Sequence, residues 1–110
     1  MSTIYKSIFD NVVSSILLLD QQLCVRHNNP AAEQLLKLSS KRIAGSHLNT
    51  LFHHLSSNTQ LFSLVFETDQ GFTDNLATLI CVDGRSVTID LSVSPIEVEQ
   101  QHLLLVEIRQ

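Results

Sequence analysis

Three histidines in one short segment, His47, His53 and His54, form the densest group of metal-ligating side chains in the sequence. The apolar residues beside them recur at helical spacing, so we predict a helix over this segment. On such a helix His47 and His54 would share a face but stand about 10 Å apart, while His53 and His54 would diverge by about 100°. A helical metal pair is spaced i and i+4. The spacing therefore favours surface or helix-end histidines over a haem or metal site.

Candidate nucleophiles are equally isolated. Cys24 and Cys81 lie far apart and form no Cys-x-x-Cys motif, which favours two reduced thiols packed as small core residues in a cytosolic protein. Ser14, His27 and Asp20 supply the residue types of a hydrolase triad, but no serine lies in a Gly-x-Ser-x-Gly motif. We therefore expect no catalytic residue.

Asp83, Gly84 and Arg85 form the remaining group that could bind a charged ligand. Asp-Gly followed by a polar residue is also what a tight hairpin requires, and apolar-rich stretches flank it on both sides. We therefore predict a hairpin turn here rather than a substrate site.

The composition is that of one folded domain, 1–110, without affinity for nucleic acid. Of the 110 residues, 44% are hydrophobic and 16% charged, and the formal net charge is −4. The local basic group, Lys37, Lys41 and Arg42, is too small for the positive stripe that phosphate binding needs. The longest aliphatic runs, 16–19 and 103–106, have four members, so neither a signal peptide nor a membrane span is expected. We expect a cytoplasmic protein.

Helical spacing of the apolar residues recurs in four segments. One is an amphipathic helix over 3–12. Asn29 and Pro30 are typical of a cap and a first turn, so a helix should begin there and end near residues 39 and 40. Two further short helices are expected after Gly45 and after the polar residues 57–59. Their apolar positions are Leu48, Leu51, Phe52 and Leu55, and then Leu61, Phe62, Val65 and Phe66.

Strands are predicted on both sides of these helices, two before and three after. The runs at 16–19 and 103–106 have no polar alternate face, so both should lie centrally in the sheet with apolar side chains on each face. The middle helices can cover one face, which leaves the other for the helix over 3–12 or for a second copy of the protein. The fold class is therefore α+β with a five-stranded antiparallel sheet. The predicted strands are 16–19, 23–27, 76–82, 87–93 and 103–108, with a polar loop after Pro95 through residue 101.

Four motifs carry a resemblance to a known family. They are Ser-Ile-Leu-Leu-Leu-Asp at 15–20, Asn-Pro-Ala-Ala-Glu-Gln-Leu-Leu at 29–36, Gly-Phe-Thr-Asp-Asn at 71–75 and Val-Asp-Gly-Arg-Ser at 82–86. With these, the chain resembles PAS domains, and among them the N-terminal PAS domains of the nitrogen-regulation (NtrB) family of sensor histidine kinases. The Asn-Pro-Ala-Ala segment is shared by many PAS domains, whereas the last two motifs are more particular to this family.

The resemblance implies a PAS-like, profilin-like sheet of strand order 2-1-5-4-3 and a cytoplasmic homodimeric parent kinase. That kinase would use ATP, phosphorylate the response regulator NtrC and be controlled by the PII signalling protein. We expect no kinase activity in the 110 residues, because none of the five histidines is followed by an acidic residue and three glycines cannot form an ATP lid. The implied order also places the strands of Cys24 and Cys81 at opposite edges, beyond disulfide reach.

Two function classes remain open. One is a sensory and dimerisation module of a sensor kinase, in which Ile4, Ile8, Phe9 and Val12 form the dimer interface; the helix could instead fold back on its own sheet and leave a monomer. The alternative is a sensor that binds haem, flavin or an organic acid between sheet and helices. We favour the first and expect no cofactor, because the sequence has no tryptophan and few aromatic residues. The Asn-Cys-Arg-Phe segment of flavin-adduct relatives is also absent from the sequence. The residues predicted to fill the interior are Leu35, Leu36, Phe52, Leu55, Phe62, Val65, Val87, Ile89 and Leu91.

Overall fold

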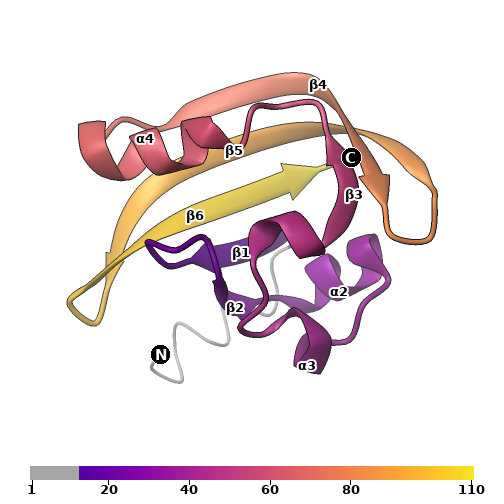
Figure 1. Cartoon of the computed structure of the whole chain (residues 1–110), viewed down its shortest axis with the longest axis horizontal. Coiled ribbons are helices and arrows are strands. Elements are labelled where there is room, and N and C mark those ends of the chain that lie inside the picture. The colour runs from indigo at the N-terminus through magenta and orange to yellow at the C-terminus, as the bar shows by residue number, and fades with distance from the viewer. Residues whose placement is uncertain (1–12) are drawn as a thin grey trace.

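One antiparallel sheet with short helical segments on one face makes up the computed structural model, which describes residues 13–110 (Figure 1). The helix predicted over 3–12, with Ile4, Ile8, Phe9 and Val12, lies outside the described residues. The strands are β1 (Ser15–Leu19), β2 (Val25–Asn28), β3 (Phe52–Leu55), β4 (Phe72–Cys81), β5 (Ser86–Val98) and β6 (Gln101–Arg109). The helical segments are α2 (Pro30–Leu36), α3 (Ser40–Ile43), the 3-10 helix η1 (Leu48–Thr50) and α4 (Gln60–Thr68).

The strand order is β2-β1-β6-β5-β4-β3, with every neighbouring pair antiparallel. The five predicted strands correspond to β1, β2, β4, β5 and β6, and they are arranged in the expected order. The expected number of strands is wrong, because the sheet has a sixth strand, β3, added beyond β4.

The sixth strand replaces the helix predicted around the three histidines. Only η1 is helical there, and Phe52 pairs with Cys81 while Leu55 pairs with Leu79 on β4. In a regular strand, residues three apart point to opposite faces, so the spacing of Phe52 and Leu55 favours a helix. The observed strand has a register shift between Phe52 and His54, and both apolar side chains pack against the main core. The backbone N–H and C=O groups at the free edge of β4 favour a strand here, because pairing with β3 gives them hydrogen-bond partners. A helix at this position would leave these edge groups without such partners.

Helix α2 begins where the sequence predicts. Asn29 is its N-cap, with Oδ1 accepting from the backbone N–H of Ala32 at 3.1 Å, and Pro30 opens the first turn. The helix ends earlier than predicted, because Lys37 adopts a left-handed conformation with φ 56° and terminates it. A separate short helix, α3, then starts after its own cap, Ser39.

The sequence predicts the β4–β5 hairpin correctly but not the β5–β6 hairpin. The turn between β4 and β5 contains Asp83 and Gly84, as predicted, and Gly84 has a φ of 91°. The polar loop predicted after Pro95 is wrong, because β5 continues through Pro95 to Val98 and pairs with β6 along that whole length. The turn is reduced to Glu99 and Gln100, whose φ values of 50° and 67° match a tight two-residue hairpin.

The main core lies between the sheet and the helices. Phe62 of α4 is fully buried and contacts Phe72 of β4 edge to face, with ring centroids 5.7 Å apart. Of the residues predicted to fill the interior, Leu35, Leu36, Phe62, Val65, Ile89 and Leu91 are buried in this core, and Phe52, Leu55 and Val87 are partly buried against it. No helix in the described range is long and apolar enough to span a membrane.

The two cysteines do not both lie on edge strands. Cys24 precedes β2 and forms an isolated bridge with His47, whereas Cys81 lies on β4, one strand inside the edge because β3 covers it. Both are free thiols, Cys24 half-buried and Cys81 fully buried. The predicted edge position is therefore wrong for Cys81.

Candidate functional site

The sheet face opposite the helices carries a second apolar cluster, separate from the main core. Side chains alternate between the two faces along a strand, so the apolar runs of β1 and β6 supply both clusters. We define the outer patch as Ile16, Leu18, Ile96, Val98, Leu103 and Leu105. Its position on β1, β6 and the hairpin end of β5 makes it the candidate interaction surface.

The rest of this outer face is mostly polar, apart from Ile80 on β4, and the boundary runs across β5. Leu103 stands opposite Ile96, but the next outward positions pair Leu105 with Ser94 and Glu107 with Ser92. Further along, Thr88 stands opposite Thr78 of β4. The apolar cluster on this face therefore lies in the β1–β6 half.

Exposure differs within the outer patch. Ile16, Leu18 and Leu103 are only 8%, 3% and 2% exposed in the single chain, whereas Ile96, Val98 and Leu105 remain partly exposed. The latter three form a rim on which further apolar surface can be buried. Sequence reasoning missed Ile96 and Val98, because it assigned them to a loop, although their alternation with Glu97 is the period of a strand.

Asn29 links the outer patch to the helix layer and to the entry of the chain into the sheet. Its Oδ1 accepts from the backbone N–H of Ile16 at 2.9 Å as well as from Ala32, and its Nδ2 donates to the carbonyl of Ser14 at 2.8 Å. The side chain is fully buried. One residue thus fixes the start of β1, the start of α2 and the backbone that precedes β1.

Asp83 and Arg85 make contacts within the fold. Arg85 Nε donates to Asp83 Oδ2 at 2.7 Å, and Arg85 Nη2 donates to the carbonyl of Leu35 at 2.6 Å. The hydrogen bond from Arg85 lowers the pKa of the Asp83 carboxyl below its usual range. The structure therefore agrees with the turn predicted for this segment.

The three histidines are not brought together. His47 caps η1, with Nδ1 accepting from the backbone N–H of Asn49 at 3.1 Å, and His53 and His54 are exposed neighbours on β3, where the register shifts between Phe52 and His54. Within residues 13–110, no three His, Cys, Asp or Glu side chains are grouped as metal ligands.

The residue types of a nucleophile site are engaged in structural contacts. The Asp20 carboxylate accepts from the backbone N–H groups of Gln22 and Cys24 in the turn between β1 and β2. Cys81 Sγ lies 3.6 Å from the carbonyl of Leu35, and burial raises the pKa of its thiol. A buried thiol with a raised pKa is a poor nucleophile.

Comparison with known proteins gives consistent results. The PAS fold family matches residues 3–109. The sensory histidine kinase/phosphatase NtrB of Vibrio alginolyticus is 40% identical over 103 residues, which make up 94% of this chain and 29% of that protein. NtrB of Escherichia coli O157:H7 is 44% identical over 79 residues, 72% of this chain and 22% of that protein. The chain thus spans less than a third of these relatives.

Solved structures extend the similarity to the whole fold. The crystal structure of the PAS domain of nitrogen regulation protein NR(II) from Vibrio parahaemolyticus matches with a TM-score of 0.87 and 37% identity, covering 99% of each chain. The PAS domain of the fruit-fly ELK potassium channel shares the fold at 12% identity, with a TM-score of 0.75 and coverage of 100% of this chain and 98% of that one. The resemblance carried by the four sequence motifs is confirmed. The chain belongs to the PAS family and is similar to the PAS domains of NtrB sensory histidine kinases.

Proposed function

We propose that this chain is the sensory and dimerisation module of a two-component nitrogen-regulation sensor histidine kinase. The observation that carries the proposal is the outer patch, an apolar surface on a sheet whose other face is already covered by helices. Its rim, Ile96, Val98 and Leu105, stays partly exposed, and exposed apolar surface is typical of interaction sites. Similarity to the NtrB kinases supports a role for such an interaction in two-component signalling.

The proposed interaction is a homodimer in which Ile4, Ile8, Phe9 and Val12 supply the apolar stripe that meets the outer patch. A two-fold arrangement lets the stripe of each copy contact its mate or the sheet of its mate, which gives a self-complementary interface. Burying one such side chain is worth roughly 1.5 to 3 kcal/mol. A few of them are enough to stabilise a dimer.

Light scattering after size exclusion tests this proposal. The unmodified chain should elute with the mass of two chains, and Leu105→Lys should shift it towards one. Thr88→Lys is the matched control, because Thr88 is exposed on the same sheet face but lies in the polar half. Ile8→Lys tests the partner side of the contact. A monomeric parent chain, or a Leu105→Lys variant as dimeric as Thr88→Lys, would contradict the proposal.

Within the parent kinase, which we propose is cytoplasmic, the module would pass its state to the ATP-dependent kinase that phosphorylates NtrC under control of PII. A full-length kinase carrying Leu105→Lys should then transfer phosphate to NtrC at an altered rate or respond differently to PII, while Thr88→Lys should behave as the parent does. Equal behaviour of all three proteins would exclude a signalling role for the outer patch.

The alternative, a cofactor between sheet and helices, has weaker support. Phe62, Phe72, Leu36 and Leu51 occupy the space between α4, α2 and the sheet, so a flat cofactor would have to displace them. We expect purified protein to be colourless. A visible absorption band of haem or flavin, or an organic ligand in the mass spectrum of an extract, would reverse this preference.

A further inference from the structure

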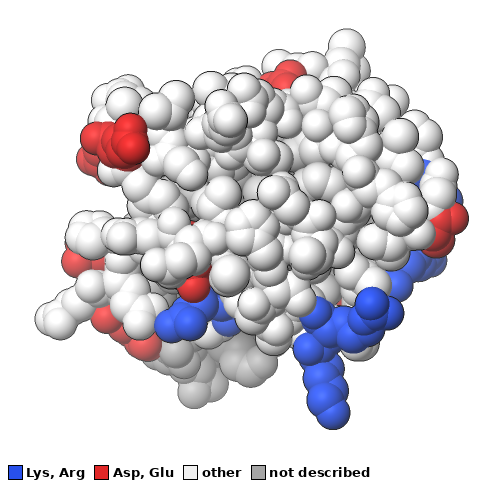
Figure 2. Space-filling view, viewed as in Figure 1, with Lys and Arg blue, Asp and Glu red and all other residues white. Residues whose placement is uncertain are grey.

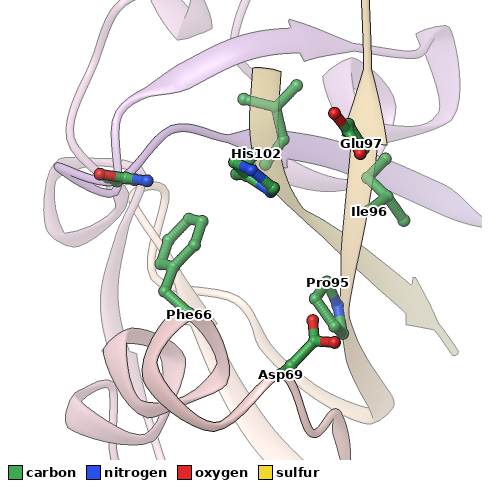
Figure 3. A pocket seen from close by; sticks show the side chains of 8 residues that line it. Phe66, Asp69, Pro95, Ile96, Glu97 and His102 are labelled. Carbon is green, nitrogen blue, oxygen red and sulfur yellow. The ribbon is translucent and has the colours of Figure 1, made fainter. Parts of the chain in front are cut away.

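A cleft of about 470 Å³ lies at the end of the molecule where α4 faces the β5–β6 hairpin (Figure 3). In Figure 3 the side chains of Phe66 and Asp69 enter from the helix side, and Pro95, Glu97 and His102 line the strands opposite. Gln21, from the turn between β1 and β2, also lines the cleft, as do Ile96 and Leu103 of the outer patch. The volume is in the range of pockets that hold small organic molecules.

The cleft combines a hydrophobic wall with acidic groups. Phe66 is half-buried against the main core, so its position is fixed by packing, and Pro95 faces it as a rigid second apolar surface. The carboxylates of Asp69 and Glu97 are exposed and come from opposite sides, α4 and β5. A ligand seated on the aromatic ring would therefore meet negative charge on two sides.

The end of α4 increases this negative potential. Asp69 is the C-cap of α4, Glu67 lies in the last turn, and that turn contains no basic residue. The carbonyl end of a helix carries a partial negative charge that a cation normally offsets. Asp69 also takes a left-handed conformation with φ 56°, where glycine or asparagine is usual. Local stability alone does not favour an acidic residue at this position.

The charges of the whole surface agree with this local arrangement. In Figure 2 the acidic atoms collect on the left side, over the end that holds the tip of α4 and the β5–β6 hairpin in Figure 1, while most basic atoms lie at the lower right. Arg26, which lines the adjoining hollow, lies 3.9 Å from Asp20 and is thus partly neutralised. Since no three ligating side chains are grouped for a metal among residues 13–110, an organic cation fits better than a metal ion.

We propose that this cleft binds an organic cation, an alkylammonium or guanidinium group on an apolar stem, with the head between Asp69 and Glu97 and the stem against Phe66 and Pro95. The cation and the aromatic face attract each other, and the two carboxylates fix the position of the head. The cleft shares Ile96 and Leu103 with the outer patch, but the four residues proposed to hold the cation lie outside that patch. Binding of the cation is therefore measured separately from the proposed dimer.

The test is an NMR titration of the isotope-labelled chain with agmatine, which has both a guanidinium and an ammonium group. Pentanol is the uncharged control and pentanoate the anionic one. Acetyl-arginine amide carries the same head group on a peptide unit, so comparing its affinity with that of agmatine shows whether a free metabolite or a protein side chain suits the cleft better. We expect saturable shifts at Phe66, Asp69, Glu97 and His102 with both cations, and none with pentanol or pentanoate.

Matched variants test the residues. Asp69→Asn keeps a side chain that tolerates the left-handed conformation, and Glu97→Gln keeps the shape of the strand residue; each should weaken binding by roughly two- to fivefold, the range of an exposed ion pair. Glu33→Gln changes the total charge equally but lies on α2, outside the cleft, and should leave the affinity unchanged. Equal weakening by Glu33→Gln, or shifts that do not saturate with either cation, would overturn the proposal.

Discussion

Arg85 caps the carbonyl of Leu35: its Nη2 donates a hydrogen bond of 2.6 Å to that oxygen, and the β4–β5 hairpin is thereby fastened to the C-terminal end of α2. The last carbonyls of a helix have no partner within it, so a side chain from elsewhere can satisfy them. Asp83 accepts from Nε of the same guanidinium and thus orients it. The Asp-Gly-Arg-Ser segment therefore has a structural role.

Removing this cap should destabilise the domain. Arg85→Ala should lower the midpoint of urea denaturation, because the Leu35 carbonyl loses a charged donor and Asp83 loses its partner. Arg85→Lys should recover only part of the loss, since an ammonium cannot reproduce the fixed fork of a guanidinium. Thr88→Ala, exposed on the same hairpin, is the control. Identical midpoints for Arg85→Ala and Thr88→Ala would show that the cap contributes nothing.

The pair formed by Asp83 and Arg85 also predicts a pH dependence. Because the pKa of Asp83 is lower in the folded chain than in the unfolded one, the ionised carboxyl stabilises the fold above the unfolded pKa of about 3.9. That contribution is lost as the pH falls through the lower, folded value. The parent should therefore exceed Asp83→Asn in stability at neutral pH, and the difference should shrink below about pH 4. A difference that stays constant from neutral to acidic pH would rule out this origin.

Gly71 should not tolerate a side chain. A Cβ at this position would lie 2.6 Å from the backbone oxygen of Val93, which cannot move without disturbing β5. We expect Gly71→Ala to cost about 1–3 kcal/mol in the free energy of unfolding, the usual cost of overpacking. Thr73→Ala, two residues along and exposed, should be nearly neutral. Equal stability of the two variants in denaturant titrations would contradict the close approach.

The two thiols should react at different rates. Cys81 is fully buried and its thiol pKa is raised by that burial, so it should react with a disulfide reagent only when the domain opens. Cys24 is half-buried and should react first. One equivalent of fast reaction should be seen in the native protein and a second in denaturant. Fast modification of Cys81 in the native protein, located by mass spectrometry, would refute the buried assignment.

Asn29 should be the most sensitive polar position of the domain. Asn29→Ala removes the cap of α2 and leaves the N–H of Ile16 and the carbonyl of Ser14 without these bonds, which should cost about 2–4 kcal/mol. Asn29→Asp keeps both acceptor bonds but places a carboxylate against the Ser14 carbonyl, so it should cost less. Denaturant titrations compare the two variants. A smaller loss for Asn29→Ala than for Asn29→Asp would contradict this account of the contacts.

Local chemistry determined much of the fold from the sequence alone. The cap and proline at Asn29 and Pro30, and the Asp83-Gly84 turn, act over a few residues and do not depend on the rest of the chain. The unbroken apolar runs of β1 and β6 likewise predicted a sheet with apolar side chains on both faces, because side chains alternate along every strand. The four motifs were enough to identify the family.

Only the tertiary structure decided features that need a neighbouring strand or a second element. Phe52 and Leu55 lie on a strand because the edge of β4 offers backbone partners, and the register shift between Phe52 and His54 is not indicated by the apolar spacing, which fits a helix. Pro95 is accommodated in β5 because that part of the strand pairs with β6 but has no partner on β4. Proline, which has no backbone N–H, therefore removes no hydrogen bond between β5 and β4. The cleft between α4 and the β5–β6 hairpin likewise exists only because distant segments meet. Such contacts depend on the distances between residues in space, and local sequence patterns carry no information about them.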